Sequence, residues 1–215
     1  MKPRIALIHA LTLSMAPVAQ AFAELWPEAE TFNLLDDALS IDRERAGELT
    51  LAITERISQL ARYAMRSDAN AILYTCSAFG PAIEAVARWS AMPVLKPNEA
   101  MFAEALERGG RTGMLLTFQP SVESMKAEFK AQAAGREHAL EVICVPQAMV
   151  AAQRGDAAEQ GRLLAEAAAK AGPFETLMLG QFSMAPAQKA VQEKVACPVL
   201  TSPASAVHAL KKQLA

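Results

Sequence analysis

The sequence predicts an α/β protein with two similar lobes, each containing a parallel sheet of roughly four strands flanked by helices. Two observations predict this class: short apolar runs alternate with longer segments at helical spacing, and the second half of the chain repeats features of the first. A chain of 215 residues with 52% hydrophobic and 20% charged residues is also long enough to bury a large core. Disordered and fibrous classes are therefore excluded.

Eight short apolar segments are the predicted strands. They are Arg4–Ala10, Thr31–Leu35, Ala71–Thr75, Pro93–Lys96, Thr112–Thr117, Leu140–Val145, Thr176–Gly180 and Pro198–Thr201. The segments between them have helical spacing and serve as crossover connections, so we expect the strands to run parallel.

The segment after the second predicted strand is the clearest helix. Its apolar residues recur every three or four positions, at Leu49, Ile53, Ile57, Leu60 and Ala64. We expect this face to pack on the sheet.

Helix ends are also marked in the sequence. Asp156 and Glu159 have the spacing of a capping box, and Gly172 is placed to end the helix that they begin. Asn98 is expected to cap the helix that stops before Gly109-Gly110.

The two halves are related by a nearly constant shift. Pro81 pairs with Pro186, and the segment 93–95 pairs with 198–200, both at a shift of 105 residues. The segment 4–10 matches 111–117 at a shift of 107 residues, so each half opens with an equivalent strand.

This repeat divides the chain into lobes 1–108 and 109–215, with Gly109-Gly110 as the hinge and with room for the C-terminal helix to pack on the first lobe. Each lobe is expected to have a flavodoxin-like arrangement. Open parallel sheets bind ligands beyond the carboxyl ends of their strands, so we expect the pocket in the cleft between the lobes.

Charge and cysteine usage exclude several classes of function. The formal net charge is -2, which provides no basic surface for nucleic acid. The three cysteines, Cys76, Cys144 and Cys197, have neither the spacing of a disulfide framework nor that of a structural zinc site. We therefore expect a cytoplasmic protein without a metal site. A homo-oligomer is possible on this evidence from the sequence.

Residues 1–21 also have features of a secretory signal peptide: a basic start, an apolar run and a small-residue tract. Against this interpretation, His9 interrupts the apolar run and the repeat needs this segment as a strand. No other stretch is long and apolar enough for a membrane span.

Cys76 is the leading catalytic candidate. It follows a predicted strand, and the 105-residue shift places it opposite Gln181 at the end of the corresponding strand. Beyond Ser77 and Ala78 the chain enters a helix with Pro81 near its first position, so we expect free N–H groups to lower the pKa of the thiol. Cys144 and Cys197 lie in apolar surroundings and are expected to fill the core.

Other polar residues follow the first strand of each half. His9 is a candidate general acid or base, with a hydrogen-bonded core histidine as the equal alternative. In the second half, the segment Thr117-Phe118-Gln119-Pro120-Ser121 leads into a helix. Its hydroxyl and N–H groups are able to hold a carboxylate or simply to cap the helix. His138 and His208 are expected on helices away from the strand ends.

The sequence contains no GxGxxG after a strand, no GxxxxGK[ST], no HExxH and no GxSxG. Nucleotide-binding, zinc-protease and α/β-hydrolase functions therefore have no support from motifs. A mechanism without a cofactor is the simplest expectation.

Four segments together resemble the aspartate/glutamate racemase superfamily, which includes hydantoin racemases, maleate cis-trans isomerases and arylmalonate decarboxylases. They are TCSAFGP at 75–81, GMLLTFQPS at 113–121, LMLGQFS at 177–183 and CPVLTSPASA at 197–206. The resemblance implies a cofactor-independent enzyme in which two cysteines, one from each lobe, exchange protons with opposite faces of a small carboxylate or related carbonyl substrate.

This sequence departs from the family pattern at the second cysteine, where it has Gln181 followed by Phe182. A glutamine donates and accepts hydrogen bonds but exchanges no proton in the accessible pH range. We therefore expect a variant with one catalytic cysteine, in which Cys76, Gln181 and His9 carry the chemistry. The remaining residues expected to bind substrate are Ser77, Ala78, Thr117, Gln119, Ser121, Phe182 and Ser183.

Three mechanisms stay open on this basis. They are protonation of an enolate after decarboxylation, addition of the Cys76 thiolate to a double bond with isomerisation, and racemisation with a second base such as His9. Phe79, Phe118 and Phe182 are candidates for an apolar subsite or for core positions. The alternatives from other classes are an inactive two-lobed protein that binds a small molecule, and a redox-responsive thiol protein.

Overall fold

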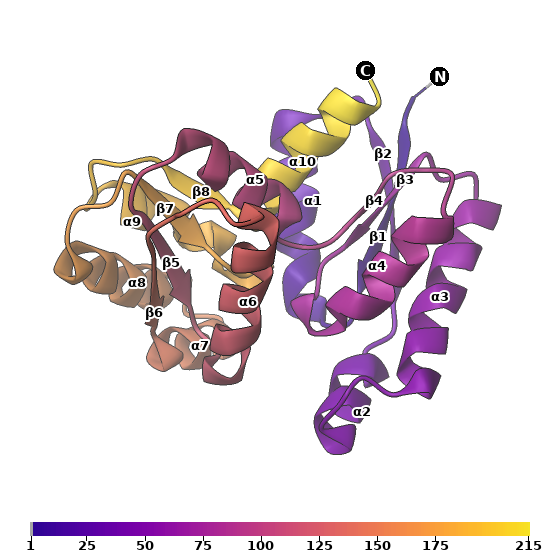
Figure 1. Ribbon diagram of the computed structural model, residues 1–215, viewed down its shortest axis with the longest axis horizontal. Helices are drawn as coiled ribbons and strands as arrows, with labels where there is room; N and C mark the ends of the chain where they lie inside the picture. Colours follow the sequence, from indigo (N-terminus) through magenta and orange to yellow (C-terminus); the bar gives the residue numbers. More distant parts are fainter. Residues whose placement is uncertain (1) are drawn as a thin grey trace. The chain divides into compact units, whose positions relative to one another are not determined.

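The computed structural model describes residues 2–215 as two compact units, each with its own four-stranded parallel sheet (Figure 1). The first unit holds the chain up to Pro97 together with Ala206–Ala215, and the second holds Asn98–Ser205. The α/β class and the two parallel sheets predicted from the sequence are confirmed.

The first unit contains a sheet in the order β2-β1-β3-β4. The strands are β1 (Arg4–His9), β2 (Glu30–Leu35), β3 (Ala71–Tyr74) and β4 (Val94–Leu95). The helices are α1 (Met15–Leu25), α2 (Ala38–Ala46), α3 (Leu51–Arg66) and α4 (Gly80–Trp89). Helices α3 and α4 pack on one face of the sheet. Helix α1 lies on the other face (Figure 1).

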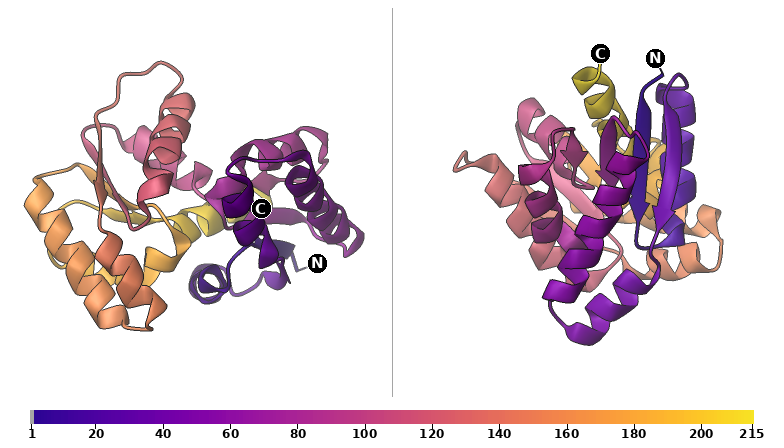
Figure 2. Two further views of the ribbon diagram at one scale, coloured as in Figure 1. Left: turned by 90° about the horizontal axis from the view of Figure 1, so that it is seen from below. Right: turned by 90° about the vertical axis from the view of Figure 1, so that its right-hand side faces the viewer.

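The second unit has the equivalent order β6-β5-β7-β8. Its strands are β5 (Thr112–Leu116), β6 (Leu140–Cys144), β7 (Thr176–Leu179) and β8 (Val199–Thr201). Its helices are α5 (Glu99–Arg108), α6 (Val122–Ala133), α7 (Pro146–Gln153), α8 (Ala157–Ala171) and α9 (Gln188–Gln192). Helices α5 and α6 cover one face of the sheet, and α7, α8 and α9 cover the other (Figure 2).

The sheet registers match the repeat predicted from the sequence. Ile5 pairs with Ala71 across β1 and β3, and their counterparts at shifts of 107 and 105 residues, Thr112 and Thr176, pair across β5 and β7. The pairing of β3 with β4 repeats in the same way in β7 and β8. Residues at equivalent sequence positions therefore occupy equivalent places in the two sheets.

The division between the units differs from the predicted boundary at Gly109-Gly110. Helix α5 buries Met101, Phe102 and Ala105 in the same core as strands β5 and β7, so it belongs to the second unit. The final helix, α10 (Ser202–Gln213), begins in the second unit, and its residues from Ala206 onward belong to the first unit. Near its end Lys211 Nζ donates to the Leu25 carbonyl, 3.1 Å away, so the end of α10 contacts α1 of the same unit.

Local signals in the sequence account for much of this structure. The apolar stripe of α3 buries Ile53, Ile57 and Ala64, while Asp156 accepts a hydrogen bond from the Glu159 N–H at the start of α8. Asn98 stands at the N-cap of α5 without capping it, which corrects the prediction. Its side chain instead accepts a hydrogen bond from the Ser202 hydroxyl and donates to the Met125 sulfur.

Residues 4–9 form the central strand β1, the arrangement that the repeat required of the N-terminal segment. Within residues 2–215, no helix combines the length and apolar character needed to cross a bilayer.

Candidate functional site

The candidate site of the first unit lies at the carboxyl end of β3. Thr75 and Cys76 follow the last residue of the strand, and Ser77–Phe79 form a 3₁₀ turn that leads into α4. Pro81 lies in the first turn of α4, where a proline leaves no hydrogen bond unmade. Cys76 is partly exposed, whereas Thr75 is buried.

The surroundings of the Cys76 sulfur act on its pKa in opposite directions. Burial raises the pKa of the thiol, while hydrogen bonds from the Ala78 N–H and the Ser40 hydroxyl lower it. Burial is the larger effect, so the expected lowering by the helix start was wrong. The Ser40 hydroxyl also lies 3.1 Å from the Ala10 carbonyl oxygen, and its single proton must serve one of these two acceptors.

His9 lies at the end of β1 in a network of polar side chains. Its Nε2 is 2.9 Å from Asn33 Oδ1, and its Nδ1 is 2.8 Å from Thr75 Oγ1 and 3.1 Å from Ser14 Oγ. The Asn33 oxygen is an acceptor, so this arrangement assigns the ring proton to Nε2 and makes Nδ1 the acceptor for a hydroxyl.

These bonds favour a structural role for His9 over the predicted role of acid or base. Only 1% of His9 is exposed, and both ring nitrogens have partners within the first unit. Burial lowers the pKa of His9 and outweighs the hydrogen bond that His9 donates to Asn33, which raises it. The neutral imidazole therefore holds Thr75, the residue that precedes Cys76.

Sequence analysis did not identify Ser14, Ser40, Asn33 or Thr75 as part of this site. Thr75 directly follows a strand, but Ser14 lies in the turn after β1, Asn33 within β2 and Ser40 on α2. Only the register, which pairs Leu7 with Asn33 in β1 and β2, brings this polar side chain to His9.

The candidate site of the second unit centres on Gln181, which follows β7 after Gly180. The Gln181 Oε1 accepts hydrogen bonds from the Thr117 backbone N–H at 2.8 Å and from the Thr117 hydroxyl at 2.7 Å. Gln181 is partly exposed, whereas Thr117 is 2% exposed. Thr117 therefore fixes the amide of Gln181 and has no free hydroxyl proton to offer a substrate.

Gly180 is required by close packing at this point. A Cβ at this residue would lie 2.5 Å from Cδ2 of Leu116 and 3.3 Å from the Leu115 carbonyl oxygen. Leu116 is fully buried, so its side chain has little freedom to move away.

The other predicted binding residues of the second unit differ in accessibility. Gln119 is exposed, and Ser183 is partly exposed, but Phe182 is buried in the core. The Ser121 hydroxyl donates to the Phe118 carbonyl at 2.7 Å and does not cap α6, which corrects the predicted cap. Gln160 Nε2 donates to the Ser183 carbonyl at 3.1 Å and so ties this turn to α8.

Aromatic residues near the strand ends separate into core and surface. Phe79 and Phe182 are buried, whereas Phe118 is 48% exposed. In the first unit, Leu11 and Leu35 are similarly exposed after β1 and at the end of β2. Of the three aromatic candidates, Phe118 alone has surface to offer an apolar part of a substrate.

The remaining cysteines and histidines lie outside these groups. Cys197 is buried, and Cys144 ends β6 with partial exposure; burial raises the pKa of both thiols. His208 lies on α10, but His138 lies in the loop before β6 and not on a helix as predicted. In residues 2–215 no cluster of His, Cys, Asp and Glu side chains is suited to hold a metal.

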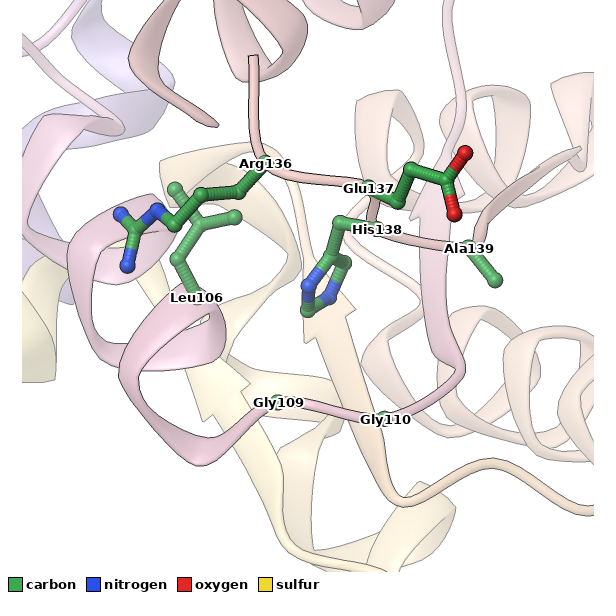
Figure 3. Close-up of a pocket in the computed structure, with 7 residues that line it drawn as sticks. All are labelled: Leu106, Gly109, Gly110, Arg136, Glu137, His138 and Ala139. Carbon is green, nitrogen blue, oxygen red and sulfur yellow. The ribbon is translucent and has the colours of Figure 1, made fainter. Parts of the chain in front are cut away.

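A hollow of about 390 Å³ lies at the opposite, amino-terminal edge of the second sheet (Figure 3). Its lining includes Gly109, Gly110, Arg136 and His138, and the His138 Nε2 is 2.8 Å from the Thr112 hydroxyl. Ligands of parallel α/β sheets bind at the carboxyl edge, so we assign the site to the strand ends and not to this hollow.

Two α/β units repeat one topology, with a thiol after the third strand of one and an amide at the equivalent position of the other, which defines a duplicated α/β protein. The chain belongs to the Asp/Glu/hydantoin racemase family, whose model matches residues 10–212. Membership of this family implies a racemase or isomerase.

Solved structures of similar fold come from several racemases. Allantoin racemase from Klebsiella pneumoniae is 18% identical with a TM-score of 0.76, and the match covers 99% of this chain and 87% of that one. A glutamate racemase from Bacillus anthracis is 14% identical with a TM-score of 0.73, covering 100% and 82%. An aspartate racemase homologue from Pyrococcus horikoshii is 18% identical with a TM-score of 0.72, covering 99% of both chains. No curated protein sequence matches the chain.

Proposed function

We propose that the protein is a cofactor-independent isomerase that moves a proton at the carbon next to a carbonyl group, with Cys76 as its single acid–base group. The observation that carries this proposal is the equivalence of Cys76 and Gln181, which follow equivalent strands at the carboxyl edges of two sheets with matching register. The family to which the chain belongs supports the class of reaction.

The chemistry requires a thiolate and a substrate oxygen that accepts electrons. The Cys76 thiolate removes the α-proton, and the electron pair of the C–H bond moves to the carbonyl oxygen. The new thiol returns a proton to the same face of the enolate, which gives exchange without inversion, or to the other face after the enolate has turned over in the site, which inverts the carbon. Because burial raises the pKa of Cys76, the thiol is the resting form at neutral pH. Exchange should therefore become faster as the pH rises and more thiolate forms.

Gln181 gives this reaction a direction. An amide has no proton to exchange at accessible pH, so proton transfer takes place from the side of Cys76 alone. The α-proton of one enantiomer should then exchange with solvent faster than the carbon inverts. The substrate is a small carboxylate or a related carbonyl compound, as the resemblance of the motifs implies.

The test is deuterium incorporation from heavy water into α-substituted dicarboxylates, hydantoins and arylmalonates. Cys76→Ala should abolish incorporation while leaving the circular dichroism spectrum unchanged. Cys144→Ala is the matched control, because Cys144 also ends a strand and is partly exposed. Incorporation that persists in Cys76→Ala would contradict the proposal.

Decarboxylation is the second candidate, and the protonated thiol favours it. Loss of CO₂ leaves its electron pair on the substrate as an enolate, and the Cys76 thiol then protonates carbon from one side, so one acid is sufficient. Release of CO₂ from arylmalonates that depends on Cys76 would select this reaction over isomerisation.

A binding protein without catalysis is the alternative from another class, since Gln181 replaces an ionisable group. A compound that raises the melting temperature equally in the native protein and in Cys76→Ala, without turnover, would favour it.

We also propose a cytoplasmic location, because an odd number of cysteines without a disulfide framework fits a reducing compartment.

A further inference from the structure

Helix α2 places the Ser40 hydroxyl on the Cys76 sulfur, to which this hydroxyl donates a hydrogen bond. The helix has nine residues, and a helix of this length is not stable by itself in water. Leu39 is the single buried residue among residues 38–46, and it shares the core with Ile53 and Ile57 of α3. Apolar packing therefore holds α2 at one point, and polar contacts must determine where Ser40 lies.

Arg56 of α3 supplies these polar contacts. Its Nε lies 2.9 Å from one carboxylate oxygen of Asp36, and its Nη2 lies 2.5 Å from the other. Its Nη1 donates to Asp42 Oδ2 at 2.5 Å. Asp36 directly follows β2, whereas Asp42 is on α2, so one guanidinium joins the end of β2, α2 and α3.

The arrangement requires the planar guanidinium of an arginine. Hydrogen bonds to Asp36 and then to Asp42 raise the pKa of Arg56. Between 24% and 39% of each of the three side chains is exposed, so water weakens the attraction between the charges. The guanidinium nevertheless fixes the directions of both carboxylates, which the compact ammonium group of a lysine would not do.

Ser40 lies between the two carboxylates along the chain, and its hydroxyl has two competing acceptors. One is the Cys76 sulfur, and the other is the Ala10 carbonyl oxygen, 3.1 Å away. A serine hydroxyl has one proton, so the position of α2 decides which acceptor receives it. A rotation of α2 about the buried Leu39 would take the hydroxyl from the sulfur without removing the helix from the core.

We propose that Arg56 is a positioning residue for the Cys76 thiol. Through its two carboxylate partners it keeps the Ser40 hydroxyl on the sulfur. A hydrogen bond from this hydroxyl stabilises the thiolate more than the thiol, so Arg56 increases the fraction of Cys76 that reacts at a given pH. The inference rests on the proposed function for its effect on turnover, but its effect on the thiol is measured separately.

Alkylation of Cys76 by iodoacetamide measures this effect. Arg56→Met keeps the aliphatic stem and loses the guanidinium, so alkylation at about pH 8, below the usual thiol pKa, should slow about fivefold. Arg56→Lys should slow it less, because the charge is kept. Arg62→Met is the matched control and should leave the rate unchanged, since Arg62 is on the same helix but stacks on Trp89.

A second pair of variants changes the contact from the side of α2. Asp42→Ala removes the carboxylate that connects this helix to Arg56, and it should slow alkylation in the same direction. Glu44→Ala, at an exposed position of the same helix, should leave the rate unchanged. Circular dichroism of each variant shows whether the fold is kept.

A double variant separates positioning from a general change in exposure of the sulfur. If Arg56 acts through Ser40, adding Arg56→Met to Ser40→Ala should cause no further change in the rate of alkylation. A further slowing of the same size would overturn the inference. Faster alkylation of either Arg56→Met protein would also overturn it, because the guanidinium would then act by covering the sulfur.

Turnover distinguishes this inference from the proposed function. If both hold, Arg56→Met should slow deuterium incorporation and alkylation by a similar factor, with the change in kcat and little change in KM. Slower alkylation with unchanged incorporation would leave the role of Arg56 in place and contradict the role of Cys76. Unchanged alkylation in Arg56→Met would overturn the inference, whatever the result for incorporation.

Discussion

The two units share a topology and a register, yet they differ directly beneath their carboxyl edges. In the first unit, a polar group joins the ends of three strands and the turn after β1: His9, Ser14, Asn33 and Thr75. The equivalent positions of the second unit, taken from the matching registers, are Leu116, Ser121, Val142 and Gly180.

The difference shows two ways of supporting a residue that follows a strand. In the first unit, the Thr75 hydroxyl lies 2.8 Å from His9 Nδ1 and 2.9 Å from the Ser14 hydroxyl. In the second, Leu116 fills the space that a side chain at residue 180 would need. One feature is shared: Ser14 donates to the Leu11 carbonyl as Ser121 donates to the Phe118 carbonyl. The turns after β1 and β5 are therefore alike, and the support below Cys76 and Gln181 is not.

A substitution that makes the carboxyl edge of the second sheet resemble that of the first should have the largest effect on the reaction. Gln181→Cys introduces a thiol at the position equivalent to Cys76, and a second acid–base group contributes about 100-fold or more to proton transfer. We expect the ratio of inversion to α-proton exchange to rise by a factor of this order, measured by chiral chromatography and NMR in heavy water. An unchanged ratio would show that the two positions do not serve one substrate.

Gly180→Thr gives the second unit a threonine at the position equivalent to Thr75 of the first unit. The added side chain meets Leu116 and the Leu115 carbonyl, so the free energy of unfolding should fall by about 3 kcal/mol in urea denaturation. Leu116→Ala should recover part of this loss in the double variant. A Gly180→Thr protein as stable as the native one would contradict the close packing described for this turn.

His9→Leu gives the first unit a leucine where the second unit has Leu116. It removes the acceptor of the Thr75 hydroxyl and crowds the Thr75 side chain, so it should lower the free energy of unfolding by about 2 kcal/mol. Adding Thr75→Gly provides the space that Gly180 provides for Leu116. The double variant should therefore be more stable than the sum of the single changes predicts, and strict additivity would refute the equivalence of the two pairs.

The buried histidine also predicts how stability varies with pH. Because the pKa of His9 is lower in the folded state than the usual 6.5, the unfolded chain takes up its proton first as the pH falls. Folding stability should therefore decline below about pH 6.5, and His9→Gln should reduce this decline. His208→Gln, on the exposed surface of α10, is the control, and an identical decline in all three proteins would count against a buried neutral His9.

The smallest predicted effect concerns Ser40. Its hydroxyl lowers the pKa of Cys76, so Ser40→Ala should raise that pKa further and slow alkylation of Cys76 by iodoacetamide at a fixed pH. Cys144 serves as the internal reference for the reagent. Faster alkylation in Ser40→Ala would show that the hydroxyl does not contact the sulfur.

Sequence analysis predicted the layers of the fold and the positions of the strands, because apolar periodicity and the repeat are local or near-local signals. It placed Cys76 and Gln181 after equivalent strands, because the repeat aligns the two strand ends. It did not find Asn33 or the bond from Thr117 to Gln181, because these contacts join residues 24 and 64 positions apart. Such pairs depend on sheet register, which no spacing in the sequence gives.

Sequence analysis also did not predict the direction in which the pKa of Cys76 is shifted. The turn after β3 predicted N–H donors near the sulfur, and the Ala78 N–H is one. How deeply the sulfur is buried depends on side chains from other elements, and that burial outweighs the donors. For the same reason, the core positions of Phe79 and Phe182 became clear only in the folded chain.

The proposed function depends on one thiol that exchanges a proton on one side of a carbonyl compound. Incubating each enantiomer of a substrate separately in heavy water measures exchange and inversion together. We predict that one enantiomer gains deuterium at its α-carbon well before it inverts, and that Cys76→Ala abolishes the gain. Equal rates of exchange and inversion, or exchange that survives the loss of Cys76, would contradict the account.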